Sequence, residues 1–74
     1  MIEFEITISR HEDGTKITIK KYANSNKEAQ ELAFRDKAII EFLAGYDGLY
    51  NVKVINTEVQ AMSKLVIVTK PQLN

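Results

Sequence analysis

Apolar and polar residues alternate strictly along residues 2–10. One face of a strand over this stretch would carry four large apolar side chains, Ile2, Phe4, Ile6 and Ile8. The opposite face would carry the polar side chains of Glu3, Glu5, Thr7 and Ser9. A period of two with β-branched residues is typical of a strand that buries one face only. The pattern therefore predicts a half-buried strand at the start of the chain.

The same alternation returns over residues 15–23, after a turn signal. Asp13-Gly14 separates the two runs, and glycine adopts the positive φ that tight hairpin turns require. A tight turn centred on these two residues would pair Ile8 with Ile19, whereas a four-residue loop would pair Ile8 with Ile17. Both registers keep the apolar faces together. The sequence therefore predicts a β-hairpin over residues 2–23 and leaves its register open.

The spacing of apolar residues changes to three and four over residues 25–44, which predicts a helix. Ser25 and Glu28 have the spacing of a capping box, in which both side chains accept hydrogen bonds from backbone amides at the helix start. Gly45 suits the left-handed conformation that ends many helices. The main apolar arc of this helix should pack on the sheet. It consists of Ala29, Leu32, Ala33, Ile39, Ile40, Leu43 and Ala44.

Alternation resumes in the second half of the chain and predicts a second hairpin over residues 49–69. Its first strand runs from about Leu49 to Asn56, and residues 57–64 are ambiguous because the strand could continue through Gln60. Its second strand covers residues 65–69 and ends before Pro71, since proline cannot continue a ladder. Residues 70–74 are expected to be a loose tail.

The order of the predicted elements is ββαββ, and 74 residues make one domain, residues 1–74. The helix returns the chain across the sheet, so the third strand should run parallel to the second and lie beside the first. We therefore predict an α+β fold. It has a single four-stranded antiparallel sheet in the order 2-1-3-4, with one helix packed on one face.

A second apolar stripe on the predicted helix has no place in that fold. Phe34, Ala38 and Phe42 are spaced four residues apart and lie nearly opposite the main arc. Removing one phenylalanine ring from water is worth roughly 1.5–3 kcal/mol, so a monomer rarely leaves two of them exposed side by side. Either the stripe binds a second copy or another protein, or the helix is rotated, in which case Phe42 and Ile39 belong to the core edge and only Phe34 is exposed.

The predicted fourth strand is apolar on both faces, which is typical of a strand buried on both sides. A sheet with one helix has only one covered face, so Val66 and Val68 would need a further cover. The candidate partner-binding residues are therefore Phe34, Ala38, Phe42, Val66 and Val68. The partner would be a different protein or a second copy in a homodimer.

Asp36 falls within the main apolar arc of the predicted helix. A buried carboxylate must be paired or hydrogen-bonded. We expect Asp36 to lie at the edge of the arc, where it reaches solvent or its neighbours Arg35 and Lys37.

Composition narrows the function further. Ten Lys and Arg balance ten Asp and Glu, so charge gives no strong attraction to nucleic acid or anionic membrane. Cysteine is absent, the single histidine His11 lies in a predicted turn, and turns or a cap account for Gly14, Gly45 and Gly48. We therefore expect no enzyme activity, no metal and no cofactor. The first residues lack a signal-peptide pattern and the longest apolar run is too short for a membrane span, which predicts a cytoplasmic protein.

Single-stranded nucleic acid remains an alternative partner. The outer face of the first hairpin would show Lys16, Lys20 and Tyr22, and the third strand would add Lys53. Basic residues beside an aromatic ring on an open sheet are typical of single-strand platforms. Glu3 and Glu5 share that face, which makes the protein partner the favoured prediction.

The hairpin followed by Asn24-Ser25-Asn26-Lys27-Glu28-Ala29 resembles the short DpnD/PcfM-like proteins of phages and mobile elements. Those proteins also have two strands and then an acidic, alanine-bearing helix that opens on a Ser-x-x-Glu-Ala type motif. The architecture is similar to that of small phage inhibitors of host defence, including anti-CRISPR proteins. The resemblance covers residues 2–44 and implies a phage or mobile-element protein that binds a host protein in the host cytoplasm.

Overall fold

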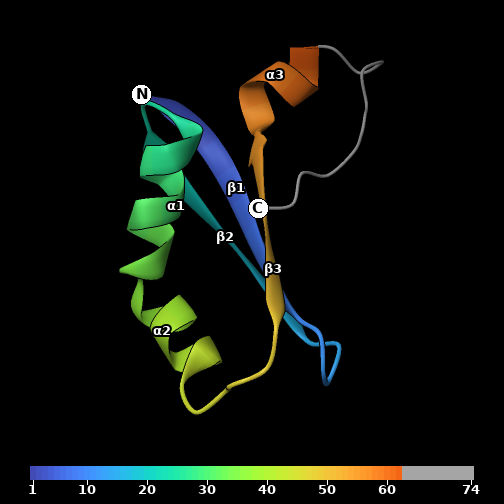
Figure 1. The fold of residues 1–74 in the computed structure, drawn as a ribbon. Coiled ribbons are helices and arrows are strands. Elements are labelled where there is room, and N and C mark those ends of the chain that lie inside the picture. The colour runs from blue at the N-terminus through green and yellow to red at the C-terminus, as the bar shows by residue number, and fades with distance from the viewer. Residues whose placement is uncertain (63–74) are drawn as a thin grey trace.

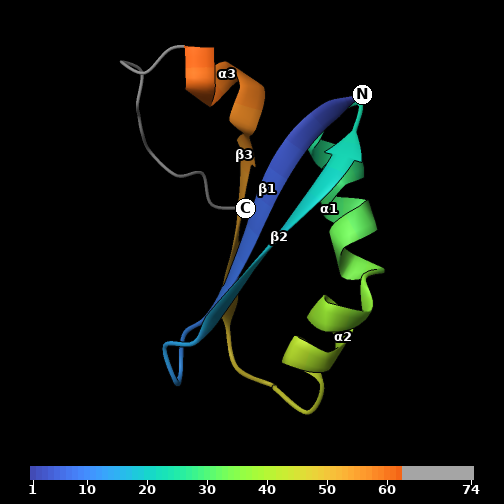
Figure 2. The same cartoon turned by 180° about the vertical axis from the view of Figure 1, so that it is seen from behind.

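The computed structural model describes residues 1–62 of this chain. In chain order the elements are β1 (Ile2–Arg10), β2 (Lys16–Ala23), α1 (Asn26–Phe34), α2 (Lys37–Leu43), β3 (Tyr50–Asn56) and α3 (Thr57–Met62). Strand β1 is central in a three-stranded sheet of order β2-β1-β3 and pairs antiparallel with both neighbours. Helices α1 and α2 lie along one face of the sheet (Figure 1 and, from behind, Figure 2). The fold is a small α+β fold.

The predicted four-stranded sheet is wrong, because the sheet formed by residues 1–62 has three strands. Their order and the parallel relation of β2 and β3 are as predicted. Strand β3 does not continue through Gln60. The Asn56 side chain accepts hydrogen bonds from the amides of Glu58 (3.0 Å) and Val59 (3.1 Å), and this cap starts α3. The predicted strand at residues 65–69 and the tail at residues 70–74 lie outside the described residues.

The first hairpin adopts the second of the two predicted registers, with Ile8 opposite Ile17. The loop is closed by two backbone bonds, from the Arg10 amide to the Thr15 carbonyl (2.8 Å) and from the Gly14 amide to the Arg10 carbonyl (3.1 Å). Gly14 has a φ of 72°, in the left-handed region that favours glycine. The longer loop therefore fixes which residues of β1 and β2 face each other.

The prediction of one helix over residues 25–44 is also wrong. Helix α1 begins as predicted, because the Glu28 amide donates to Ser25 Oγ (3.2 Å) and the Glu28 carboxylate accepts from the Asn24 amide (2.7 Å). The chain then breaks at Asp36, which has extended φ and ψ of −75° and 135°. The Asp36 carboxylate accepts from the Ala38 amide at 2.8 Å and thereby caps α2.

Asp36 also binds Lys21, which lies on the helix-facing side of β2 and which sequence reasoning had not linked to it. Lys21 Nζ and Asp36 Oδ2 are 2.7 Å apart, and both side chains are about three-quarters buried. The Lys21 hydrogen bond, followed by that of the Ala38 amide, lowers the pKa of Asp36 from its ordinary value. Lys21 therefore ties the break between α1 and α2 to the sheet.

This lowered pKa predicts a loss of stability in acid. A carboxylate whose pKa is lower in the folded state stabilises the fold fully above its unfolded value of about 4, and the contribution disappears as pH falls through the folded value. Asp36→Asn keeps a good capping side chain but removes the charge. We expect its urea midpoint to lie below that of the wild type at pH 7, and the difference to shrink progressively as the pH falls below the unfolded value. Asp47→Asn, at an exposed aspartate, is the control and should match the wild type throughout.

The core lies between β1 and the two long helices. Phe4, Ile6 and Ile8 of β1 are buried, and alanines at positions 29 and 33 let α1 approach them closely. Among residues 1–59, the buried apolar side chains are Phe4, Ile6, Ile8, Ala23, Ala29, Ala33, Ile39 and Val52. Ile40 was predicted to be in the core but is 54% exposed, because the break at Asp36 resets the helical phase of α2.

Candidate partner-binding surfaces

Two residues of the predicted stripe, Phe34 and Phe42, have packing partners inside the chain. Phe34 and Phe42 are partly buried and pack against the core, whereas Ala38 is exposed. The Phe34 ring meets the Tyr50 ring of β3 with centroids 6.3 Å apart. The break between α1 and α2 removes the continuous helix on which the stripe was defined. That these residues bind a partner stays a prediction.

The other two candidate partner-binding residues, Val66 and Val68, lie outside the described residues.

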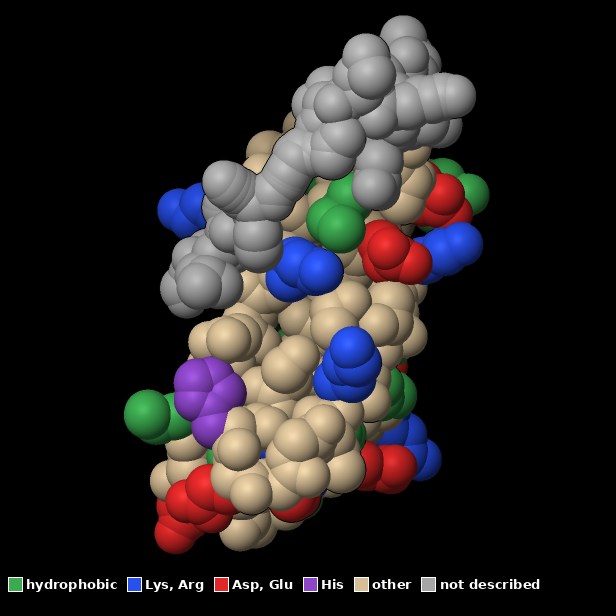
Figure 3. Space-filling view, turned by 90° about the vertical axis from the view of Figure 1, so that its right-hand side faces the viewer, with side chains coloured by type: hydrophobic (Ala, Val, Ile, Leu, Met, Phe, Trp, Pro, Cys, Tyr) green, Lys and Arg blue, Asp and Glu red, His purple; other side chains and the backbone are tan. Residues whose placement is uncertain are grey.

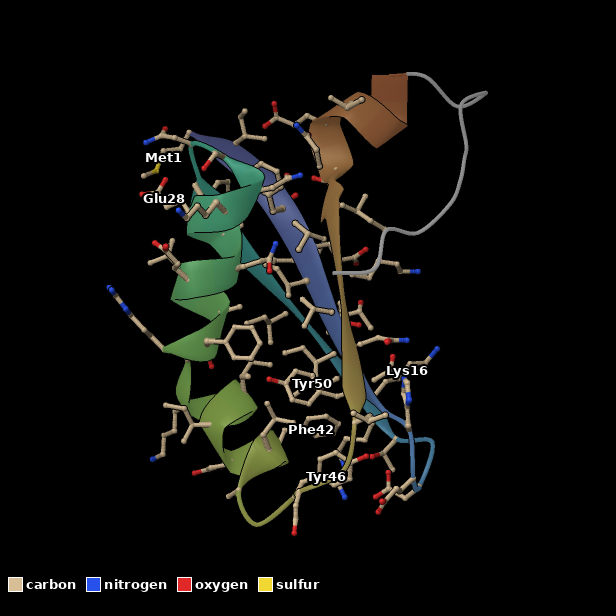
Figure 4. All side chains as sticks on the ribbon, in the orientation of Figure 1. Met1, Lys16, Glu28, Phe42, Tyr46 and Tyr50 are labelled. Carbon is tan, nitrogen blue, oxygen red and sulfur yellow. The ribbon has the colours of Figure 1, made fainter. Side chains whose placement is uncertain are left out.

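At the α2 end of the core, the Arg10 side chain lies between two aromatic rings. The guanidinium carbon of Arg10 lies 5.0 Å from the centre of the Phe42 ring and 4.6 Å from that of Tyr46. Arg10 Nη1 donates to the Phe42 carbonyl at 2.7 Å, and Nη2 forms an ion pair with Asp13. Figure 4 shows Tyr50, Phe42 and Tyr46 one below another between α2 and β3. Sequence reasoning missed this cluster, although Arg10 follows Ile8 on the same face of β1.

The turn around this cluster is held by side chains. The Tyr46 hydroxyl donates to the Leu49 carbonyl at 2.7 Å and accepts from the Glu12 amide at 3.1 Å. The Thr15 hydroxyl and amide donate to Asp13 and, together with Arg10, lower the pKa of that carboxyl. The Tyr46 hydroxyl, the Asp13 carboxylate and both Nη atoms of Arg10 are bonded within the chain. These bonds give the cluster a structural role.

Arg10→Met is expected to lower the free energy of unfolding by about 1–3 kcal/mol, which urea titration measures. The loss combines a cation–π contribution with a charged hydrogen bond to a carbonyl. The Nε atom of Arg10 is buried without a hydrogen-bond partner among residues 1–62, which offsets part of the gain. Arg10→Lys should retain less than half of the free energy that Arg10→Met loses, because an ammonium group cannot stack flat between rings. Arg35→Met, at an exposed arginine, is the control; an equal loss there would contradict this role of Arg10.

The four candidate nucleic-acid residues share the sheet face opposite the helices, as predicted. The register places Lys20 opposite Glu5, Tyr22 opposite Glu3, and Lys53 opposite Thr7. Tyr22 is 60% exposed, and Lys16 lies at the other end of β2. Figure 3, which views the molecule from this side, shows Lys and Arg side chains intermixed with Asp and Glu. The face therefore has no concentrated positive patch among the described residues.

The outer edge of β2 presents backbone groups that no strand of residues 1–62 pairs with. Arg10 uses both its amide and its carbonyl on the β2 side, and His11 donates to the Leu49 carbonyl on the β3 side. Because backbone groups alternate in direction along a strand, Ile17 and Ile19 bond to β1. The intervening residues then direct their amides and carbonyls away from β1. They are Lys16, Thr18, Lys20 and Tyr22, and no described strand pairs with this edge.

Other kinds of site find little support within residues 1–62. No cluster of three or more acidic or histidine side chains there has the arrangement of a metal site. An open depression lies on the exposed side of α1 and is lined by Asn26, Lys27, Gln30, Glu31, Phe34 and Arg35. No helix of this part of the chain has the length and apolar character needed to cross a membrane.

Comparison of the chain with family models, curated proteins and solved structures finds no match.

Proposed function

We propose that this chain is a small non-catalytic protein-binding module that occludes a surface of its partner. The observation that carries the proposal is the outer edge of β2, with which no strand of residues 1–62 pairs. An exposed edge can receive an extended segment of another protein as an additional strand, and the main-chain hydrogen bonds then supply affinity.

The size of the edge suits this mode of binding. Strand β2 has eight residues and, at roughly 3.3 Å per residue, extends about 26 Å. Its alternate residues offer a row of amide donors and carbonyl acceptors to the incoming strand. The Lys21–Asp36 pair and the contacts of α1 with β2 hold the strand in place, so little ordering is needed when a partner binds.

The resemblance of residues 2–44 to short phage and mobile-element proteins supports a host protein as the partner. In that setting a strand added to β2 would cover the segment that the host protein needs for another contact. Occlusion of a surface requires affinity and shape only, and no reacting group.

The direct test is a pair of substitutions at Thr18. Thr18→Pro removes one outward-directed amide and places a ring on the edge, without touching the bonds to β1. Thr18→Val keeps that amide. Both remove the Thr7–Thr18 hydroxyl contact of 2.8 Å, so they are matched in this respect. We expect the tagged wild type and Thr18→Val to capture the same host protein from extracts, and Thr18→Pro to lose it.

Circular dichroism of both variants checks that they fold. Equal capture by folded Thr18→Pro would place the interface elsewhere. If the wild type retains no host protein above the level of an unrelated bait, the protein-binding proposal fails.

Binding of single-stranded nucleic acid is the second candidate, favoured by the exposed Tyr22 ring beside Lys20 and across the sheet from Lys53. It predicts a salt-dependent shift of a short single-stranded oligonucleotide that Lys16→Glu with Lys20→Glu removes. Absence of a shift at low salt would eliminate it. Glu3 and Glu5 on the central strand oppose an anionic ligand, so the protein partner is preferred.

A further inference from the structure

We infer that the partner segment is an extended strand in which acidic and apolar side chains alternate, and that it pairs with the outer edge of β2. This inference rests on the proposed function and adds the chemistry of the partner. It follows from the two rows of side chains along β2 and from the strand that already pairs with its inner edge.

The helix-facing row of β2 favours apolar residues in the partner. Ile17 and Ile19 pack against the core but are only partly buried, so they mark the margin where the core meets solvent. A strand beside β2 would place every second side chain next to them. Apolar side chains there would continue the core across the edge.

The opposite row favours acidic residues. Lys16 and Lys20 are exposed on this face, with Thr18 between them. Lys20 has Glu5 of β1 on its inner side, but no described residue flanks it on the outer side. Because opposite charges on neighbouring strands stabilise a sheet, carboxylates in the partner would meet these two lysines.

Strand β1 shows that β2 accepts such a neighbour. On the inner edge, Ile19 lies opposite Ile6, and Lys20 lies opposite Glu5. The β1 sequence Ile-Glu-Phe-Glu-Ile is itself an alternation of acidic and apolar residues. The chain therefore contains one example of the pattern that we assign to the partner.

A second copy of this chain fits the edge less well. Strand β2 contains three lysines and no acidic residue. Pairing of two β2 edges would gather both sets of lysines on one continuous sheet, and lysine on an edge strand is a common obstacle to self-association. Charge complementarity thus selects an acidic strand over β2 itself.

Two blocked eight-residue peptides test this inference with the full chain. One alternates Glu and Val, the other alternates Lys and Val, and each carries a fluorescent label for anisotropy titration. We expect the Glu/Val peptide to bind about tenfold more tightly, because the charge pairs with Lys16 and Lys20 both change sign in the Lys/Val peptide. Lys16→Glu with Lys20→Glu should reverse the preference. The Thr18→Pro variant should bind the Glu/Val peptide about tenfold more weakly than the wild type, whereas the Thr18→Val variant should bind it with the wild-type affinity.

Equal binding of the two peptides, or no effect of Thr18→Pro, would overturn the inference. Self-association of the wild type that Thr18→Pro abolishes would assign the edge to a second copy instead. These results are separable from failure of the proposed function. If Thr18→Pro abolishes capture of a host protein but the two lysine substitutions do not, the proposed function stands. Only the acidic character of the partner strand is then refuted.

Discussion

The double substitution Phe34→Ser, Phe42→Ser is expected to lower the free energy of unfolding by about 4–6 kcal/mol. Phe34 packs on Tyr50, and Phe42 forms one side of the Arg10 stack, so both rings lose contacts within the chain. A domain of this length has a total stability of roughly 4–11 kcal/mol. The loss is therefore a large fraction of the total stability, and the urea midpoint of the double variant, followed by circular dichroism, should fall to about half that of the wild type or lower.

This variant also separates the two roles that the helical stripe was given. If the rings were an interface instead, the double variant would stay folded and lose only its association with a partner. Ile40→Ser is the matched control, because Ile40 is a large apolar residue of α2 that is 54% exposed. It should change the stability by less than about 1 kcal/mol.

Ile6→Ala is expected to cost about 3–4 kcal/mol at the centre of the sheet. Ile6 is fully buried and lies between Ile19 of β2 and Val54 of β3, so removing its side chain leaves a cavity in the core. The loss is read from the shift of the urea midpoint at unchanged slope.

Thr7→Ala provides the comparison for Ile6, since it lies next along the same strand on the opposite face. It removes the hydroxyl contact with Thr18 and should cost about 1 kcal/mol or less. Similar losses from the two substitutions would mean that the outer face of the sheet is covered as thoroughly as the inner one. That result would contradict the one-sided core.

Features set by neighbouring residues were predictable from the sequence. The alternation of β1, the capping box of Ser25 and Glu28, and the left-handed Gly45 each depend on residues within a few positions. The order β2-β1-β3 followed from the same local patterns with the rules of chain connection.

Features that depend on residues far apart in the sequence were not predictable. The apolar arc and the stripe were both placed on one continuous helix over residues 25–44. The residue that breaks this helix, Asp36, is held by Lys21 of β2. The Phe34 ring looked unpartnered because its neighbour, Tyr50, lies on β3. Asn56 was the available signal for the end of β3, since asparagine is a strong capping residue.

The candidate binding edge was partly implicit in the sequence. A sheet of order 2-1-3 leaves β2 at an edge, but the sequence left the hairpin register open. The bonds of Arg10 and His11 decide which residues of β2 direct their backbone outward. Only then do Lys16, Thr18 and Lys20 become the residues that a partner strand would meet.

Amide hydrogen exchange of β2, resolved by residue in NMR spectra, tests the binding edge most directly. In the free chain we expect the amides of Ile17 and Ile19 to be protected by β1 and those of Thr18 and Lys20 to exchange rapidly. Saturation with the Glu/Val peptide, or with the captured host protein, should slow amide exchange at Thr18 and Lys20 by about tenfold or more. Unchanged exchange at Thr18 and Lys20 in the bound state, with new protection on another element, would contradict the account.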